Sequence, residues 1–293
     1  MQTPTHIAWL HDLPERPAAG RCETATRRRL DTELVRRGLV ASRDQARAVI
    51  ADGLVLVSGA PSGKPDRLVD PGEPIVVVGP PARFVGRGGH KLEAALDRFD
   101  IDVHGLRVID VGASTGGFTD CLLQRGAWSV VAVDVGHGQL HERLRHDPRV
   151  VVHERTNVRY AEPATLGGPA PLVVADLSFI SLRTVLDALL KLTSPDGRLI
   201  VLIKPQFEAG RLEASRGRGV ITDPTVWRRV LGEVRHDVVA RGAAMMGIMV
   251  SPIKGADGNV EFLALIARGD GGVDDLALDA VVAEAQGAPG EAP

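Results

Sequence analysis

Cysteine, aromatic side chains and long apolar runs are all scarce in this chain of 293 residues. The two cysteines, Cys22 and Cys121, are too few for a disulfide scaffold or a cysteine-rich zinc site, and we expect no metal centre. No apolar run approaches the roughly 20 residues that a membrane-spanning helix needs, and no basic start leads into the apolar stretch of a secretory signal. We therefore expect a cytoplasmic protein of a reducing compartment that does not bind membranes.

Charge is unevenly distributed along the chain. The formal net charge is −2, yet the segment from Gly269 onward carries six acidic residues and no basic one, which leaves +4 on the rest. Between Arg27 and Arg47 there are seven arginines against three acids. Such a run suits a contact with nucleic acid, although the solvated face of a helix has the same composition. Aromatic residues make up only 3% of the chain. Recognition of the shape and backbone of a folded RNA is therefore favoured over stacking of its bases on aromatic side chains.

The length predicts about two domains. Residues 1–26 lack periodicity and are interpreted as a disordered leader. Residues 27–79 indicate a small α+β unit, in which a helix through Leu30 and Leu34 ends at Gly38 and a second helix begins at a capping box on Ser42. We expect strands at Val55–Val57 and Pro74–Val78, followed by a linker at residues 80–86.

Residues 87–268 indicate a second, larger α/β domain. Short apolar strands alternate there with helical segments such as Leu182–Leu192, which predicts a Rossmann-like, doubly wound and mostly parallel sheet covered on both faces. The expected strands are Arg107–Val111, Val130–Asp134, Val150–Val152, Leu172–Asp176 and Leu199–Ile203. We expect an antiparallel hairpin of Ala244–Val250 and Val260–Ala267 at one edge. Residues 269–293 are interpreted as an acidic tail that holds a weak helix at Val273–Ala285 or is disordered.

A glycine-rich loop follows the first expected strand of the larger domain. Its spacing, Gly112-x-x-x-Gly116-Gly117, is neither the dinucleotide fingerprint nor the phosphate-binding loop. The glycines let a ligand approach the backbone, and the next helix offers free N–H donors. Asp134 ends the next strand, where an acid accepts hydrogen bonds from a ribose diol. A tight strand–helix turn is the simpler interpretation, but the pattern favours a nucleoside cofactor without phosphates, for which S-adenosylmethionine is the natural candidate.

Charged residues end two of the predicted strands. Asp176 and Lys204 stand at carboxyl ends, where ligands of open α/β sheets bind, while Lys91 opens a helix and Glu261 opens the last strand. Each one alone is more readily interpreted as a surface charge. Together they form a candidate Lys-Asp-Lys-Glu cluster, in which a lysine whose pKa is lowered by burial and a neighbouring ammonium removes the proton of a ribose hydroxyl.

Other methyl acceptors fit the sequence less well. Transfer to a base carbon uses a cysteine nucleophile, but Cys121 lies inside the helix after the glycine loop and Cys22 lies in the leader. Transfer to an exocyclic amine commonly uses an Asn/Asp-Pro-Pro-aromatic loop, whereas Asp176 is followed by Leu-Ser-Phe.

Taken together, the motifs resemble the TlyA family, whose members are often labelled hemolysins. The motifs are the residue runs 86–92, 110–120, 138–140, 155–159, 176–182 and 204–208. The N-terminal unit resembles the S4-like RNA-binding domain and the larger unit resembles FtsJ-type ribose methyltransferases, over about Arg27 to Arg268. Phe84 and Gly86 depart from the family pattern, which has a larger aromatic residue and a serine there.

The resemblance implies S-adenosylmethionine-dependent 2′-O-methylation of cytidine in ribosomal RNA. By motif position it implies a catalytic tetrad of Lys91, Asp176, Lys204 and Glu261, with Lys204 at the acceptor hydroxyl. It also implies a cofactor site made of Gly112, Gly116, Phe118, Asp134, Asn157 and Asp176. The arginines of the N-terminal unit then become candidate contacts to RNA phosphates: Arg28, Arg29, Arg36, Arg37, Arg43 and Arg47. The alternatives are a membrane-active hemolysin and a non-catalytic, RNA-binding factor of ribosome assembly.

Overall fold

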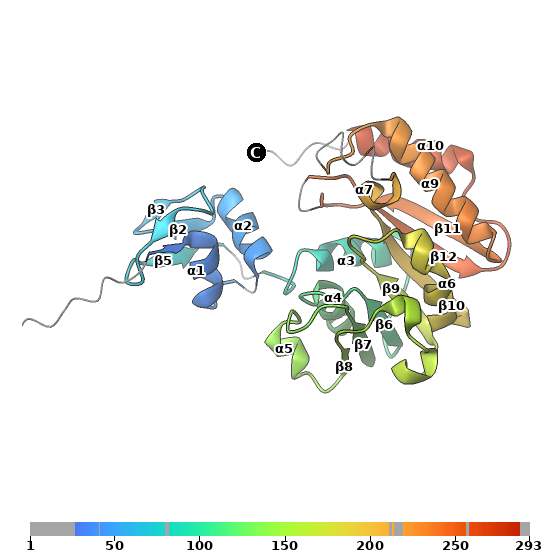
Figure 1. Ribbon diagram of the computed structural model, residues 1–293, viewed down its shortest axis with the longest axis horizontal. Coiled ribbons are helices and arrows are strands. Elements are labelled where there is room, and N and C mark those ends of the chain that lie inside the picture. The colour runs from blue at the N-terminus through green and yellow to red at the C-terminus, as the bar shows by residue number, and fades with distance from the viewer. Residues whose placement is uncertain are drawn as a thin grey trace, which may run out of the picture.

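The computed structural model describes residues 27–40, 42–79, 82–210, 213, 219–255 and 258–287. The expected leader, with Cys22, lies outside these residues. A small N-terminal unit, blue in Figure 1, is followed by a larger α/β unit.

The small unit packs two helices on short strands. Helix α1 (Leu30–Arg36) and helix α2 (Arg43–Ala51) precede a sheet with the order β3 (Ala60–Pro61), β2 (Val55–Val57) and β5 (Ile75–Val77). Ser42 caps α2 as predicted, because its Oγ accepts a hydrogen bond from the Gln45 N–H at 3.2 Å. The two-residue strands β1 (Arg28–Arg29) and β4 (Leu68–Val69) form an additional antiparallel pair. One apolar cluster fills this unit: Leu30, Leu34, Val40, Ala46, Ile50, Val55, Val57, Val69 and Ile75.

The larger unit is built on a seven-stranded sheet with the order β11-β12-β10-β9-β6-β7-β8. Strands β8, β7, β6, β9 and β10 run parallel, while β12 and β11 are antiparallel and form the edge hairpin. This confirms the predicted doubly wound, mostly parallel α/β fold with a small N-terminal unit. The strands are β6 (Arg107–Val111), β7 (Ser129–Val133), β8 (Val150–His153), β9 (Ala170–Ala175), β10 (Thr193–Ile203), β11 (Ala243–Val250) and β12 (Phe262–Arg268).

Helices cover both faces of the sheet because its strands alternate apolar side chains between them. On β9, for example, Val173 packs toward one face and Val174 toward the other. Helices α6 (Leu182–Leu192), α9 (Pro224–Val239) and α10 (Asp275–Gly287) cover the first face, and α3 (Gly88–Arg98), α4 (Gly117–Gln124) and α5 (Glu142–Arg145) cover the second. Figure 1 shows the two groups of helices on opposite sides of the strands.

The structure departs from the sequence-based expectations at two strand starts, in one helix and in the tail. Strand β12 begins at Phe262, two residues later than expected, and β10 begins earlier, at Thr193. Helix α9 was not predicted, although Asp223 caps it, Pro224 opens it and its apolar residues recur at helical spacing. The acidic tail contains a helix close to the expected position, α10, but its Leu278 and Val282 are buried against the sheet, so the fold continues past residue 268.

Strand register explains why distant polar residues meet. Val111 pairs with Ala175, which sets Gly112 beside Asp176. Ile203 pairs with Phe262 in the antiparallel direction, which sets Lys204 beside Glu261. The strands β12, β10, β9 and β6 are consecutive in the sheet. Glu261, Lys204, Asp176 and Gly112 therefore form a row at the carboxyl ends of the parallel strands.

Asp110 is a buried carboxyl in the strand that leads into the glycine loop. Its Oδ2 accepts a hydrogen bond from the Thr119 hydroxyl at 2.6 Å, and its Oδ1 has no hydrogen-bond partner among the described residues. Burial raises the pKa of Asp110 to about 7. The folded protein therefore keeps this proton up to about pH 7, whereas the unfolded chain releases it near pH 4. The unfolded state binds fewer protons in that window, so this group makes stability fall as pH rises through it.

We expect the Asp110→Asn variant to lose this pH dependence. Between pH 4 and pH 8 its unfolding free energy should improve relative to the parent protein by about 4 kcal/mol, the value of a shift of about three pKa units. Urea unfolding of both proteins at several pH values measures this difference. A difference that stays constant with pH would show that Asp110 is charged in the folded state.

Candidate active site

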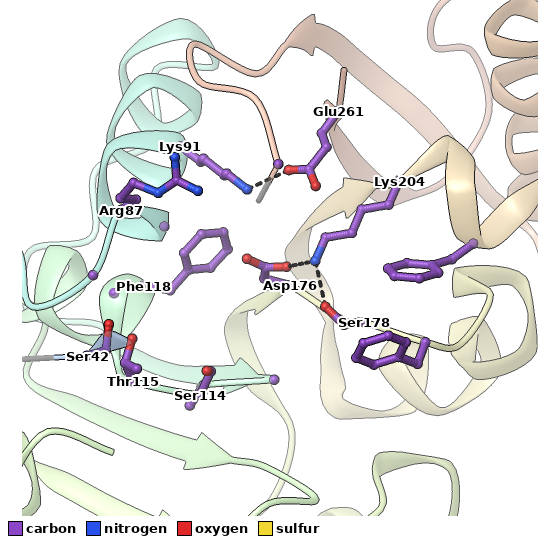
Figure 2. Close-up of a pocket in the computed structure, with 18 of the residues that line it drawn as sticks. Ser42, Arg87, Lys91, Ser114, Thr115, Phe118, Asp176, Ser178, Lys204 and Glu261 are labelled. Carbon is purple, nitrogen blue, oxygen red and sulfur yellow. Dashed lines mark hydrogen bonds and ion pairs between the residues drawn. The ribbon is translucent and has the colours of Figure 1, made fainter. Parts of the chain in front are cut away.

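A cavity of about 560 Å³ opens at this edge of the sheet. All four residues of the predicted tetrad line it: Lys91, Asp176, Lys204 and Glu261. Gly112 and Phe118, two of the predicted cofactor residues, line it as well. Figure 2 shows Lys91 and Glu261 pointing toward each other across the cavity, and Lys204 directed at Asp176. The structure thus brings together side chains that are up to 170 positions apart in the sequence.

The tetrad forms two ion pairs. Lys91 Nζ lies 2.5 Å from Glu261 Oε2, and both side chains are buried. Lys204 Nζ lies 2.5 Å from Asp176 Oδ1 and also donates a hydrogen bond to Ser178 Oγ at 3.0 Å. Charged groups that are buried away from water need a partner of opposite charge. The paired carboxylate therefore gives each lysine amine a defined position in the cavity.

Close packing between α3 and α4 brings Lys91 to the cavity. Gly89 in α3 and Gly117 in α4 face each other, and a Cβ on Gly117 would stand 2.9 Å from the Gly89 nitrogen. A Cβ on Gly89 would in turn collide with the ring of Phe84. Both positions therefore require glycine, and the helix that carries Lys91 approaches the glycine loop more closely than bulkier residues would allow.

The glycine loop runs directly beneath Asp176. Gly112 has a φ of 84°, in the left-handed region, and a Cβ on it would collide with the Asp176 carbonyl oxygen. Gly116 has a φ of 98°, and a Cβ there would collide with Leu144. Gly116 supports the turn from behind and does not line the cavity. Side chains at these positions would displace the loop from the carboxylate that pairs with Lys204.

Asp134 and Asn157 lie beside the loop and are not among the residues that line the cavity. The Asp134 carboxylate accepts hydrogen bonds from the backbone N–H of Ser114 at 2.7 Å and of Gly136 at 2.6 Å. Asn157 is exposed and caps a short 3₁₀ helix, η1 (Val158–Tyr160), through the Arg159 N–H. The preceding residue, Thr156, donates its N–H to the Asp134 carbonyl at 2.9 Å, so the two segments are adjacent. The cofactor roles of Asp134 and Asn157 stay predictions.

Sequence reasoning missed an aromatic pair next to Lys204. Phe179 is 92% exposed, has a φ of 64° and lies 5.3 Å from Phe207 between ring centroids. Lys204 Nζ lies 5.9 Å from the centroid of the Phe207 ring. The scarcity of aromatic residues concealed this pair, because a composition does not show where the few are placed. The sequence feature that could have identified the pair is the position of Phe179, three residues after Asp176 and outside the apolar strand.

Arg87, Ser42 and Gln45 also line the cavity and were not predicted as site residues. Arg87 forms no ion pair with any residue in the described parts of the chain. Ser42 and Gln45 belong to the start of α2, so the small N-terminal unit contributes to the wall of the cavity.

The predicted RNA-contacting arginines lie outside the cavity lining. Each of the six forms an ion pair with one of two buried acids, Asp31 and Glu33. Arg37 additionally donates to the backbone carbonyls of residues Asp70, Pro71 and Glu73. These contacts make Arg37 part of the fold of the small unit, whereas the other five keep a solvent-facing side.

Cys121 is not placed to act as a nucleophile. It is buried in α4, and burial raises the pKa of its thiol to about 12. The thiolate that methyl transfer to a base carbon requires is therefore disfavoured at neutral pH.

Comparisons with known proteins agree with this geometry. A model of FtsJ-like methyltransferases matches residues 84–268, and a model of the S4 domain matches residues 28–75. A protein of Mycobacterium tuberculosis named 16S/23S rRNA (cytidine-2′-O)-methyltransferase TlyA is 50% identical over 239 residues, which cover 81% of this chain and 89% of the relative. Hemolysin A of Brachyspira hyodysenteriae is 39% identical over 238 residues, which cover 80% of this chain and 98% of the relative.

A solved structure extends the likeness to three dimensions. A chain from Streptococcus thermophilus, solved under a hemolysin designation, has a TM-score of 0.72 and 40% identity, covering 90% of this chain and 97% of that one. No helix in the described parts of the chain combines the length and apolarity needed to cross a membrane. The sequence motifs, the sheet order and these relatives agree: the chain belongs to the FtsJ-like methyltransferase family and, within it, to the TlyA group that carries an S4 domain.

Proposed function

We propose that this enzyme transfers a methyl group from S-adenosylmethionine to the 2′-oxygen of a cytidine in ribosomal RNA. The observation that carries the proposal is the meeting of two lysine–carboxylate pairs in one cavity beside a glycine loop. The name of the Mycobacterium tuberculosis relative, which specifies the cytidine 2′-oxygen, supports the same reaction.

The residues beside the cavity suit this cofactor. The volume of about 560 Å³ lies within the usual range of small-molecule sites, and the loop residues Gly112, Ala113, Ser114 and Thr115 form part of its wall. The candidate holding residues are Gly112, Phe118 and Asp176, which line the cavity, and Gly116, Asp134 and Asn157, which lie outside its lining. When bound, S-adenosylmethionine supplies a sulfonium methyl whose carbon–sulfur bond breaks as the oxygen–carbon bond forms, with the electron pair staying on sulfur.

Lys204 is assigned to the acceptor hydroxyl. The Lys204 ammonium must first release one proton to solvent. Its neutral Nζ then takes the proton that leaves the 2′-oxygen, while Asp176 and Ser178 hold that nitrogen from two directions. The Lys91–Glu261 pair fixes a second amine in the cavity, where it orients the sugar. Fixed positions matter because methyl transfer requires donor and acceptor in line at roughly 3 Å.

The target nucleotide has further partners at the mouth of the cavity. Exposed Phe179 offers a face on which a base displaced from its own stack can pack. Arg87, without an ion pair among the described residues, offers a cation for a phosphate. The start of α2 contributes Ser42 and Gln45 to the cavity wall, and the same helix carries Arg43 and Arg47. RNA that binds these arginines therefore lies next to the cavity.

The test is transfer of labelled methyl groups by the purified protein to ribosomal RNA or ribosomal subunits prepared from cells that lack the gene. We expect incorporation into RNA that requires both protein and cofactor. Binding to the RNA without incorporation would favour the non-catalytic assembly factor, and lysis of vesicles by the protein alone would favour the membrane-active alternative.

The Lys91–Glu261 pair can be disturbed by a substitution at a third residue, with Lys91 and Glu261 themselves unchanged. A Cβ on Gly255, whose backbone is not left-handed, would stand 2.5 Å from Glu261 Oε1, the end of a flexible side chain. We therefore expect Gly255→Ala to fold normally and to reduce kcat by about 10- to 100-fold, with unchanged cofactor affinity. The matched control is Gly287→Ala, where a Cβ meets open space. Equal kcat values for the two variants would remove this pair from the mechanism.

A further inference from the structure

Asp31 and Glu33 are buried acids that organise the arginines of the small unit. Both belong to α1 and are at most 1% exposed. Asp31 accepts hydrogen bonds from Arg29 at 3.1 Å and from Arg43 at 3.0 Å, and Arg47 lies 3.8 Å away. Its pKa is held below the ordinary range, because these guanidinium hydrogen bonds outweigh the effect of burial.

Glu33 is the centre of a second group. It accepts hydrogen bonds from Arg36 at 2.7 Å and from Arg37 at 2.8 Å, and Arg28 lies 3.8 Å away. The hydrogen bond from Arg36 is the main reason that the pKa of Glu33 falls to about 2. Strand β1 and helices α1 and α2 thus converge on two carboxylates that are ionised at every physiological pH.

The five arginines other than Arg37 share a particular exposure. Their side chains are between 46 and 55% exposed, so each has one side on a carboxylate and the other in solvent. Six guanidinium groups around two carboxylates leave an excess of four positive charges on this surface. A guanidinium has five N–H donors in a rigid fork, so one that is anchored to a carboxylate still has donors to offer.

We propose that Asp31 and Glu33 are positioning residues for RNA, which fix the arginines Arg28, Arg29, Arg36, Arg43 and Arg47 as a preformed array for phosphate groups. The inference rests on the proposed function, in which this surface binds ribosomal RNA. An arginine whose rotamer is already set loses less conformational freedom when it contacts a phosphate. The two acids therefore strengthen the binding of a polyanion although they carry negative charge.

The array and a simple excess of charge make opposite predictions for Asp31→Asn. This change adds one positive charge to the surface, so nonspecific attraction would tighten RNA binding. If the carboxylate positions Arg29, Arg43 and Arg47, its loss weakens binding by about fivefold or more, and the dependence of log Kd on log salt becomes shallower. The control is Asp52→Asn in the same unit, an equal charge change at an exposed carboxylate that forms no ion pair with a described residue. We expect Glu33→Gln to act like Asp31→Asn through the other group.

A second variant tests the array without replacing a buried acid, so it applies even if Asp31→Asn does not fold. Arg43→Lys combined with Arg47→Lys keeps the charge, leaves Asp31 in place and changes only exposed side chains. Lysine lacks the guanidinium fork, so the array predicts weaker RNA binding at equal net charge, while bulk attraction predicts no change. Circular dichroism and thermal unfolding of the full chain report the fold separately.

The measurement is the Kd of full-length protein for a ribosomal RNA fragment across a salt series. Weaker binding by folded Asp31→Asn and by the double lysine variant, with Asp52→Asn unchanged or tighter, supports the array. Tighter or equal binding by Asp31→Asn, or unchanged binding by the lysine variant, overturns it. Methyl transfer is assayed separately, so a protein that binds RNA in this way but transfers no methyl would refute the proposed reaction and leave the array standing.

Discussion

Replacing Lys204 with alanine should lower the rate of methyl transfer by about 10³-fold or more while leaving the affinities for cofactor and RNA within about threefold. The amine is buried, lies 2.5 Å from Asp176 Oδ1 and lines the cavity, so its removal leaves the acceptor hydroxyl without a proton acceptor. Binding survives because the glycine loop and the arginines of the small unit are untouched. Single-turnover transfer of labelled methyl groups, together with calorimetric cofactor binding, separates the two effects.

The matched control for this prediction is Lys191→Ala. Lys191 is an exposed lysine in α6, so the change removes the same charge far from the cavity. We expect full activity from it. If Lys204→Ala retained more than about a tenth of the parental rate, another group would have to accept the proton.

Gly112→Ala is the second variant with a large expected effect. The added Cβ meets the backbone carbonyl of Asp176, which cannot rotate away, and the residue must also adopt a left-handed φ of 84°. The loop and the Asp176 strand end must separate, and a shift of about 1 Å is enough to reduce transfer by about 100-fold. We expect a fall in cofactor affinity and in kcat together, measured by calorimetry and by the transfer assay.

Gly105→Ala distinguishes the collision from the backbone strain. Gly105 has a φ of 71°, and a Cβ on it meets open space, so this variant has the left-handed strain alone. We expect it to be less stable by about 1 kcal/mol but fully active. If Gly112→Ala behaved like Gly105→Ala, the loop would not have to contact Asp176 for function.

The fold of the larger unit could be predicted from the sequence because each buried strand is a short apolar run that ends in polar or glycine residues. The same rule placed Asp176 and Lys204 at one edge of the sheet. Strand order was not available from the pattern, and it is the order β12-β10-β9-β6 that joins Glu261 and Gly112 to them. Motif position alone put Glu261 in the candidate cluster, and its pairing with Lys91 in the cavity follows from tertiary packing.

Features that depend on side-chain environment were beyond the sequence. Asp31 and Glu33 looked like ordinary helix-face acids, because composition cannot show that six arginines converge on them. The sequence shows only that Phe179 follows Asp176 without the prolines of an amine-methylating loop. Its exposure was not predictable, because nothing local distinguishes an exposed phenylalanine from a buried one. For residues 269–293 the pattern predicts a weak helix or disorder, and it does not predict the burial of that helix. The reason is that the acids mask the apolar stripe that α10 buries, which includes Leu278 and Val282.

The position of the transferred methyl group tests the central claim most directly. Ribosomal RNA methylated by the purified enzyme would be digested to nucleosides, and mass spectrometry would identify the labelled product. The account predicts 2′-O-methylcytidine, formed by the parent enzyme and absent with Lys204→Ala. A methyl group on a base atom, or equal 2′-O-methylcytidine from both proteins, would contradict the assignment of this cavity to ribose methylation.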